Sequence, residues 1–150
     1  MGMFIHSSKR NFENIVKPID PNNFKLEDVQ KKLVSACEHG LVDTVRDIFE
    51  TYKIECPDLG FLRACNSGHV DVIKVCIENS KCNLTRGLHF ACKHGHIDAA
   101  RLLIEKGADI SILGEVIDDL QNGGYSSFTW TTPTSSVEEM IEFLQQYLKK

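Results

Sequence analysis

Apolar residues recur with helical spacing in short segments along the chain, and polar residues separate these segments. The spacing predicts a first helix from about residue 24 to residue 38, with an apolar stripe formed by Leu26, Val29, Leu33, Ala36 and Cys37. Similar spacing predicts helices over 61–66, 88–93 and 116–121, each followed by a partner helix. The last partner helix is expected from Ser136, where Ser136 and Glu139 can form a capping box. The pattern therefore favours an all-α fold.

A five-residue phrase occurs three times and sets the period of the chain. Residues 36–40, 64–68 and 91–95 each read alanine, cysteine, two variable residues and glycine, so the glycines lie 28 residues apart (40 to 68) and then 27 (68 to 95). Each glycine is expected to end a helix in the left-handed conformation. The aspartate three residues later, as in Asp43, is expected to cap the next helix. Self-similarity at this period indicates a solenoid of stacked helix pairs.

The third unit carries a resemblance to a known family. It reads RGLHFACKHGHID over residues 86–98 and LLIEKGADI over residues 102–110. These stretches resemble the Thr-Pro-Leu-His phrase, the leucine-rich second helix and the Gly-Ala-Asp ending of ankyrin repeats. The resemblance implies an ankyrin-type solenoid of about four stacked helix-turn-helix repeats. It covers residues 24–110 well and 111–150 weakly, and residues 1–23 match nothing we can name.

We expect one domain over residues 1–150, in five parts. These are an N-terminal extension (1–23), three repeats (24–56, 57–83 and 84–110) and a degenerate capping repeat (111–150) with an aromatic loop insertion at 123–136. The period is shorter than the roughly 33 residues of ankyrin repeats. Because the helical landmarks are intact, the missing residues must come from the connections. The hairpin fingers that project from ankyrin repeats should therefore be stunted or absent.

The first unit is expected to be the N-terminal cap of the stack. Thr44 and Asp47 are polar where the second unit has Val72 and Val75, and the outer face of an end repeat must tolerate water. The alternative is that Asp47 belongs to a face that meets solvent in every unit.

Composition and charge exclude several classes of protein. The 150 residues carry a formal net charge of −4 without a clustered basic face, which argues against nucleic-acid binding. No apolar run approaches the roughly 20 residues that a membrane span needs. The N-terminus lacks the basic and then apolar build of a secretion signal. We therefore expect a cytoplasmic monomer without a membrane or nucleic-acid partner, or a protein of the host cytosol or nucleus if the source is a virus or an intracellular microbe.

Six cysteines require that a disulfide framework be considered. Cys37, Cys65 and Cys92 occupy equivalent positions in successive units, and stacked helices lie about 8–10 Å apart, whereas a disulfide needs Cα atoms within roughly 7 Å. These residues are therefore interpreted as small, buried apolar side chains in a reducing compartment.

Catalytic and metal chemistry find little support in the sequence. Histidines and cysteines are present, but there is no Cys-x-x-Cys pair, and ligands that repeat along a stack are spread apart. His69, His89 and His96 lie where the resemblance implies hydrogen bonds between repeats. Nucleophile-elbow, Walker and dinucleotide glycine patterns are absent. No cofactor, no metal site and no enzymatic activity are predicted.

The resemblance implies binding of proteins through the first helices of the repeats. Carried over by position, the partner-binding candidates are Glu38, His39, Arg63, Asn66, Ser67, Lys93 and His94. The insertion adds Tyr125, Phe128 and Trp130, since aromatic residues commonly anchor interfaces. The rings could instead fold back and seal the C-terminal end of the core, and both readings stay open.

The main hypothesis is a non-enzymatic module that binds a cytosolic protein by occlusion or scaffolding, as an inhibitor or as a host-directed factor. The alternative is a small-molecule or enzymatic role centred on the insertion with Asp118, Asp119 and His94, which would need a concave pocket with converging polar groups. A third hypothesis is a structural fragment that works by self-association.

Overall fold

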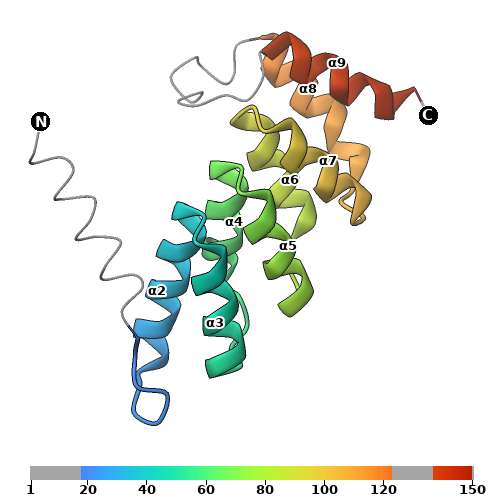
Figure 1. Cartoon of the computed structure of the whole chain (residues 1–150). Helices are drawn as coiled ribbons and strands as arrows, with labels where there is room; N and C mark the ends of the chain where they lie inside the picture. Colours follow the sequence, from blue (N-terminus) through green and yellow to red (C-terminus); the bar gives the residue numbers. More distant parts are fainter. Residues whose placement is uncertain (1–17, 123–136, 150) are drawn as a thin grey trace, which may run out of the picture.

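The computed structural model describes residues 18–122 and 137–149 of the chain. Within those ranges every regular element is a helix (Figure 1). In chain order they are α2 (Leu26–His39), α3 (Val42–Tyr52), α4 (Asp58–Ser67), α5 (Val70–Asn79), α6 (Leu84–Lys93), α7 (Ile97–Glu105), the short 3-10 helix η1 (Ile110–Ile112), α8 (Leu113–Gln121) and α9 (Val137–Leu148). The predicted all-α fold is confirmed.

The helices form antiparallel pairs, and successive pairs stack side by side (Figure 1). Helices α2, α4, α6 and α8 make one row, and α3, α5 and α7 make a second row against it. Helix α9 packs on α8 at the C-terminal end of the stack. Because each pair contacts mainly its neighbours, the arrangement is that of a repeat solenoid, as the periodic sequence indicated.

The repeated phrase ends a helix in the same way in each unit. Gly40 and Gly68 have φ angles of 71° and 74°, in the left-handed region that side chains with a Cβ disfavour. The amide that follows each glycine then donates to the carbonyl of the alanine at the start of the phrase. These bonds are Leu41 to Ala36 (3.0 Å), His69 to Ala64 (3.1 Å) and His96 to Ala91 (2.9 Å). The glycine and alanine positions are thus explained by one helix-ending motif.

The aspartates after the glycines do not cap the second helices, which corrects the sequence prediction. Helix α3 begins at Val42 with Leu41 at the N-cap, so Asp43 is already the second helical residue, and the cap makes no side-chain hydrogen bond. The same offset applies to Asp71 and Asp98. The tight turn at the glycine leads directly into the next helix, which therefore starts earlier than predicted. The carboxylates of these aspartates still stabilise the helices, because they lie in the first turn, at the positive end of the helix dipole.

The first helices of the later repeats also begin earlier than the apolar stripe predicted. Helix α4 begins at Asp58, α6 at Leu84 and α8 at Leu113. The residues of their first turns contribute little to the apolar stripe from which these helices were predicted. In α6 the side chain of Asn83 accepts a hydrogen bond from the amide of Arg86 (3.0 Å), a cap that the sequence analysis missed. The connections 53–57 and 80–83 are short and contain no strand. The expected stunting of the fingers is confirmed there.

One continuous apolar core runs between the two rows of helices. Ala36, Ala64 and Ala91 are completely buried, as are the cysteines that follow them. All six cysteines are free thiols in the structure, and the equivalent cysteines Cys37, Cys65 and Cys92 are buried, as predicted. In the described part of the chain, no helix is both long and apolar enough to span a membrane.

The outer side of the first repeat differs from that of the second repeat in the predicted sense. Asp47 is exposed and Thr44 half-buried, whereas Val72 and Val75 are buried. Residues from Pro18 onward lie against this end of the stack. The hydroxyl of Tyr52 donates to the carbonyl of Ile19, and its ring meets Phe24 edge to face with 4.8 Å between the centroids.

Two predictions for the C-terminal repeat fall on residues outside the described ranges. They are the aromatic insertion at 123–136 and the capping box that begins at Ser136. The described helix α9 begins at Val137 and buries Met140, Phe143 and Leu144. The guanidinium of Arg101 on α7 lies over the Phe143 ring, 5.4 Å from its centroid. Helix α9 thus contacts the third repeat as well as α8.

Candidate protein-interaction surface

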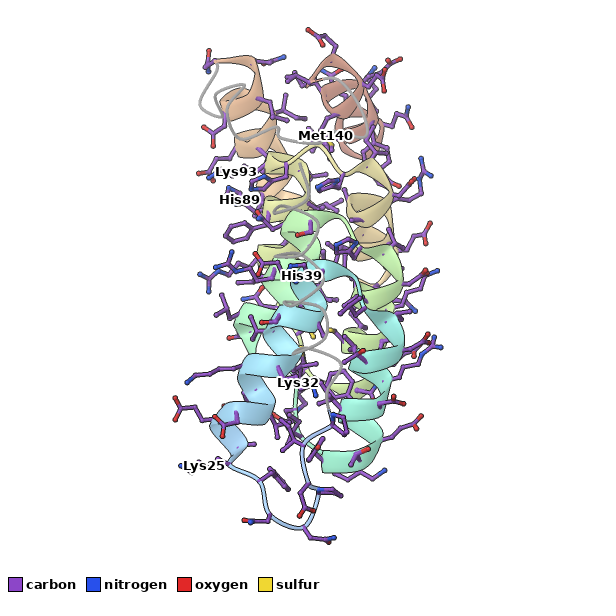
Figure 2. All side chains as sticks on the ribbon, turned by 60° about the vertical axis from the view of Figure 1, so that its left-hand side comes forward. Lys25, Lys32, His39, His89, Lys93 and Met140 are labelled. Carbon is purple, nitrogen blue, oxygen red and sulfur yellow. The ribbon has the colours of Figure 1, made fainter. Side chains whose placement is uncertain are left out.

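The first helices of the three repeats present equivalent positions on one surface of the stack. Positions three, four, seven and eight residues apart on a helix share a face, and the period of 28 and then 27 residues brings these positions into rows. We call the resulting surface the inner face. It consists of Val34, Ser35, Glu38, His39, Leu59, Arg63, Asn66, Ser67, Arg86, His89, Phe90, Lys93 and His94. Figure 2 shows His89 and Lys93 together on one edge of the stack.

The first two repeats are linked across the inner face by an ion pair. The guanidinium of Arg63 on α4 lies 3.3 Å from the carboxylate of Glu38 on α2, and both side chains are about half exposed (46% and 44%). Such an exposed pair contributes little to stability, typically about 0–1 kcal/mol. Its main effect is to fix two charged groups in register on a surface that remains open to a partner.

The seven described candidates belong to the first helices, where Arg63 lies in the middle of α4 and the other six lie at the C-terminal ends. Glu38, His39 and Arg63 are exposed, and Asn66, Ser67, Lys93 and His94 are half-buried. The His39 ring is already engaged, because its Nδ1 lies 2.8 Å from the carbonyl of Ser35. The remaining candidates, Tyr125, Phe128 and Trp130, lie outside the described residues, and their role stays a prediction.

Apolar residues of the inner face were missed by the sequence analysis. Leu59 is 53% exposed, and with Val34 and Pro57 it lines a shallow groove of about 540 Å³ between α2 and α4. His89 lines a second groove between α6 and α8. The signal that could have found them is the helical period. Leu59 lies four residues before Arg63, and His89 four before Lys93, so each pair shares a face.

The charge of the inner face changes along the stack. Helix α6 carries Arg86 and Lys93 and no acidic residue, although the chain as a whole has a net charge of −4. Helix α8, next in the row, carries Glu115, Asp118 and Asp119. On the inner face, the positively charged helix α6 therefore follows the mixed Glu38–Arg63 pair, and the acidic helix α8 comes next in the row.

Two histidines hold successive repeats together beside this surface. The Nε2 of His69 lies 3.0 Å from the carbonyl of Glu38, and the Nε2 of His96 lies 3.0 Å from the carbonyl of Asn66. Each ring also covers the glycine of the preceding repeat, where a Cβ on Gly68 would lie 2.4 Å from Nδ1 of His96. The predicted structural role of His69 and His96 is confirmed. The ring of His89 meets that of Phe90 edge to face, at 6.0 Å between centroids, and its predicted hydrogen bond between repeats stays a prediction.

His96 is the more deeply enclosed of the two rings, with 6% of its surface exposed. Burial lowers the pKa of His96 below its ordinary value, although the hydrogen bond to Asn66 opposes the shift. Its Nδ1 is buried without a hydrogen-bond partner among the described residues. The neutral ring, with its proton on Nε2, is the form that this site favours.

The cysteines were expected to be spread along the stack, and for three of them this prediction is wrong. Cys37, Cys56 and Cys76 bring their sulfur atoms within 4.8 Å of one another in the interior. They were missed because they occupy non-equivalent positions, in α2, in the connection before α4, and in α5. The repeated phrase contains only the first of them.

The family comparison agrees with the periodic structure. The family model that describes ankyrin repeats in three copies matches residues 33–113, which is more than half of the chain. This range begins within α2 and ends at the first residue of α8. Among curated proteins, the search found no significant match.

Proposed function

The chain belongs to the ankyrin-repeat family, and from this premise we propose that it binds a cytosolic protein partner through the inner face. Ankyrin repeats generally mediate protein–protein interaction and are typically not enzymes. The observation that carries the proposal is the row of exposed side chains on α2, α4 and α6, with Leu59 and the Glu38–Arg63 pair at its centre. Apolar residues flanked by ordered charges are typical of the anchor regions of interfaces.

The chemistry of the surface describes the partner segment that would fit it. A segment with an apolar side chain could enter the groove beside Leu59, where Val34 and Pro57 supply the walls. Acidic residues further along the segment would meet Arg86 and Lys93 on α6, which has no acidic residue of its own. The partner is therefore proposed to carry an acidic and apolar segment. A rigid stack that buries on the order of 1,000 Å² against it could act by occlusion or as a scaffold.

Two versions of this function remain as proposals, an inhibitor of a cytosolic enzyme and a host-directed factor. The insertion residues Tyr125, Phe128 and Trp130 are proposed to extend the interface beyond α8. The small-molecule or enzymatic alternative depends on this insertion, and nothing in residues 18–122 or 137–149 favours it.

Affinity capture from a cytosolic extract tests the proposal with matched charge reversals. Lys93→Glu changes the inner face, whereas Lys74→Glu makes the same change on the exposed side of α5, in the other row of helices. We expect a protein that is retained by the wild type and by Lys74→Glu to be lost with Lys93→Glu and with Leu59→Ser. If the inner-face variants retain the same proteins as the wild type, the inner face is not the binding surface. Trp130→Ala tests the insertion separately.

A further inference from the structure

Three thiols meet in the interior between the first and second repeats. Cys37 lies in the last turns of α2, Cys56 in the connection that leads into α4, and Cys76 in α5. The sulfur of Cys76 lies 3.9 Å from that of Cys37 and 3.5 Å from that of Cys56, and all three sulfurs lie within 4.8 Å of one another. Residues far apart in the sequence thus place their sulfurs at the corners of one small triangle.

The size of this triangle matches a shared metal ion. A metal–thiolate bond is about 2.3 Å long, so three sulfurs around one ion lie about 3.8 Å apart in tetrahedral geometry and about 4.0 Å apart in a trigonal plane. The spacing observed here, from 3.5 Å to at most 4.8 Å, brackets these values. A disulfide would involve only two of the sulfurs and would leave the third thiol unexplained.

We propose that Cys37, Cys56 and Cys76 form a binding site for a thiophilic metal ion, Cu(I) in preference to Zn²⁺. Thiolates are soft ligands that select copper(I) and zinc over harder cations. Zinc sites in proteins are almost always four-coordinate. Among the described residues the cluster contains three cysteines and no histidine or carboxylate, which fits a three-coordinate ion.

Cys82, which follows the end of α5, does not complete a four-ligand set. Cys82 is half-buried, and its thiol lies 3.6 Å from the carbonyl of Cys76 and 3.8 Å from that of Ser80. It is thus hydrogen-bonded to backbone at the end of α5 and is not one of the three mutually close sulfurs. The geometry therefore favours the trigonal ion.

Entry to the site is possible from the connection before α4. Cys56 retains 7% of its surface exposed, whereas Cys37 and Cys76 are fully buried. The connection is anchored on one side, because the amide of Cys56 donates to the hydroxyl of Ser80 (2.6 Å). On the other side Gly60 leaves space beside the sulfurs. A Cβ built on it would lie 3.5 Å from Cys56 Sγ and 3.6 Å from Cys37 Sγ. An ion would reach Cys56 first and the buried sulfurs next.

Binding of Cu(I) requires no change of oxidation state. Each coordinating thiol loses its S–H proton to solvent as its sulfur forms a bond to the ion, so three bonds to hydrogen are exchanged for three bonds to copper. The copper enters and remains as Cu(I), and the sulfurs stay at the thiolate level.

Competitive titration with Cu(I) under anaerobic conditions tests the site in the full-length protein. The reduced, metal-free chain is titrated in the presence of a chromogenic Cu(I) chelator, and X-ray absorption reports the sulfur neighbours of the bound copper. We expect one Cu(I) per chain with three sulfur neighbours at about 2.3 Å. We also expect a higher midpoint of thermal unfolding when Cu(I) is bound, since the ion binds only the folded arrangement.

Cysteine variants distinguish this site from general thiol binding. Cys56→Ser and Cys76→Ala should each lower the affinity for Cu(I) at least tenfold, since even changes around metal ligands commonly cost about 10–100-fold. Cys92→Ala is the matched control, because Cys92 is fully buried at the position equivalent to Cys37 but lies outside the cluster. It should leave both stoichiometry and affinity unchanged. If Cys76→Ala prevents folding, Cys56→Ser still tests the site, because Cys56 lies in a connection and not within a helix.

Several outcomes would overturn the proposal. They are absence of copper bound in competition with the chelator, equal losses in Cys56→Ser and Cys92→Ala, and displacement of Cu(I) by an equimolar amount of Zn²⁺. The last result would show that a four-coordinate zinc site, with a ligand from elsewhere, is the preferred state.

Discussion

The junctions between successive repeats share the same arrangement of helices, but different side chains fill the space between those helices. We call the contact of α2 and α3 with α4 and α5 the first junction, and the contact of α4 and α5 with α6 and α7 the second junction. Gly60 and Gly87 occupy equivalent positions in the two. A Cβ on Gly60 would meet sulfur atoms at 3.5 and 3.6 Å, an ordinary contact, whereas a Cβ on Gly87 would lie 2.8 Å from the ring of Phe61.

The difference arises from a few non-equivalent side chains. Phe61 fills the second junction, and the residue one period earlier is the smaller Leu33. The first junction instead gains sulfur from Cys56 and Cys76, at positions where the next repeat has Asn83 and Leu103. The repeat therefore fixes the spacing of the helices, while the filling of each junction is specific. Unequal filling leaves the first junction able to accept an ion and the second one closed.

The largest expected effect comes from emptying the second junction. Phe61→Ala removes the largest fully buried side chain among the described residues and should lower the free energy of unfolding by about 3–5 kcal/mol. Cys76→Ala in the first junction removes a single sulfur and should cost only about 1 kcal/mol. Urea unfolding of the metal-free proteins measures both losses. Equal losses would mean that the junctions do not differ in the way described.

Overpacking should affect both junctions alike at the buried alanines of the first helices. Ala64 is completely buried, and Ala64→Leu should lower the free energy of unfolding by about 1–3 kcal/mol. Ala36→Leu should give a loss of similar size, because Ala36 is equally buried one period earlier. Calorimetry or urea unfolding is the measurement. A neutral result at either position would show room at that helix contact.

The two glycines should respond in opposite directions. Gly87→Ala forces the Phe61 ring to move and should cost about 1–2 kcal/mol, after the gain in helix propensity is subtracted. Gly60→Ala meets only ordinary contacts, so the same propensity gain should leave stability unchanged or raise it by up to about 1 kcal/mol. Parallel unfolding curves of the two variants decide the point. Destabilisation of the same size in both would remove the distinction between the junctions.

The smallest expected effect concerns the histidines and depends on pH. Burial lowers the pKa of His96 in the folded state, so its contribution to stability is complete above the unfolded value of about 6.5. As the pH falls below that value, the unfolded chain takes up a proton that the folded chain resists, and stability is lost until the folded pKa is reached. His96→Gln should make the free energy of unfolding less dependent on pH below about 7. An unchanged slope in His96→Gln would contradict the assignment.

The fold was largely predictable because its defining signals are local and repeated. The alanine and glycine of the phrase specify a helix end, and their period specifies the stack. The start of the second helices was misjudged by two residues, since Asp43 looks like a cap in sequence but the observed cap is Leu41 and the helix begins at Val42. Such an offset depends on backbone hydrogen bonds that the residue types alone do not reveal.

The sites were less predictable, and for physical reasons. The charged ends of the first helices follow directly from the repeat, so Glu38, Arg63 and Lys93 could be named. Leu59 was not, because an apolar residue on a helix is normally assigned to the core, and only the packing shows it to be exposed. The sulfur cluster depends on three positions that no periodicity relates. It became visible only when α5 and the connection before α4 were placed beside α2.

The histidine contacts give the stack a direction. His69 bonds to the carbonyl of Glu38, 31 residues earlier, and His96 to that of Asn66, 30 residues earlier. The following repeat therefore supplies the histidine that hydrogen-bonds the end of each of these first helices. During synthesis on a ribosome, the carbonyl at the end of α2 would remain without this hydrogen bond until roughly one further repeat had been synthesised. A chain truncated from its C-terminus would lose the corresponding hydrogen bond in the last repeat that it retains.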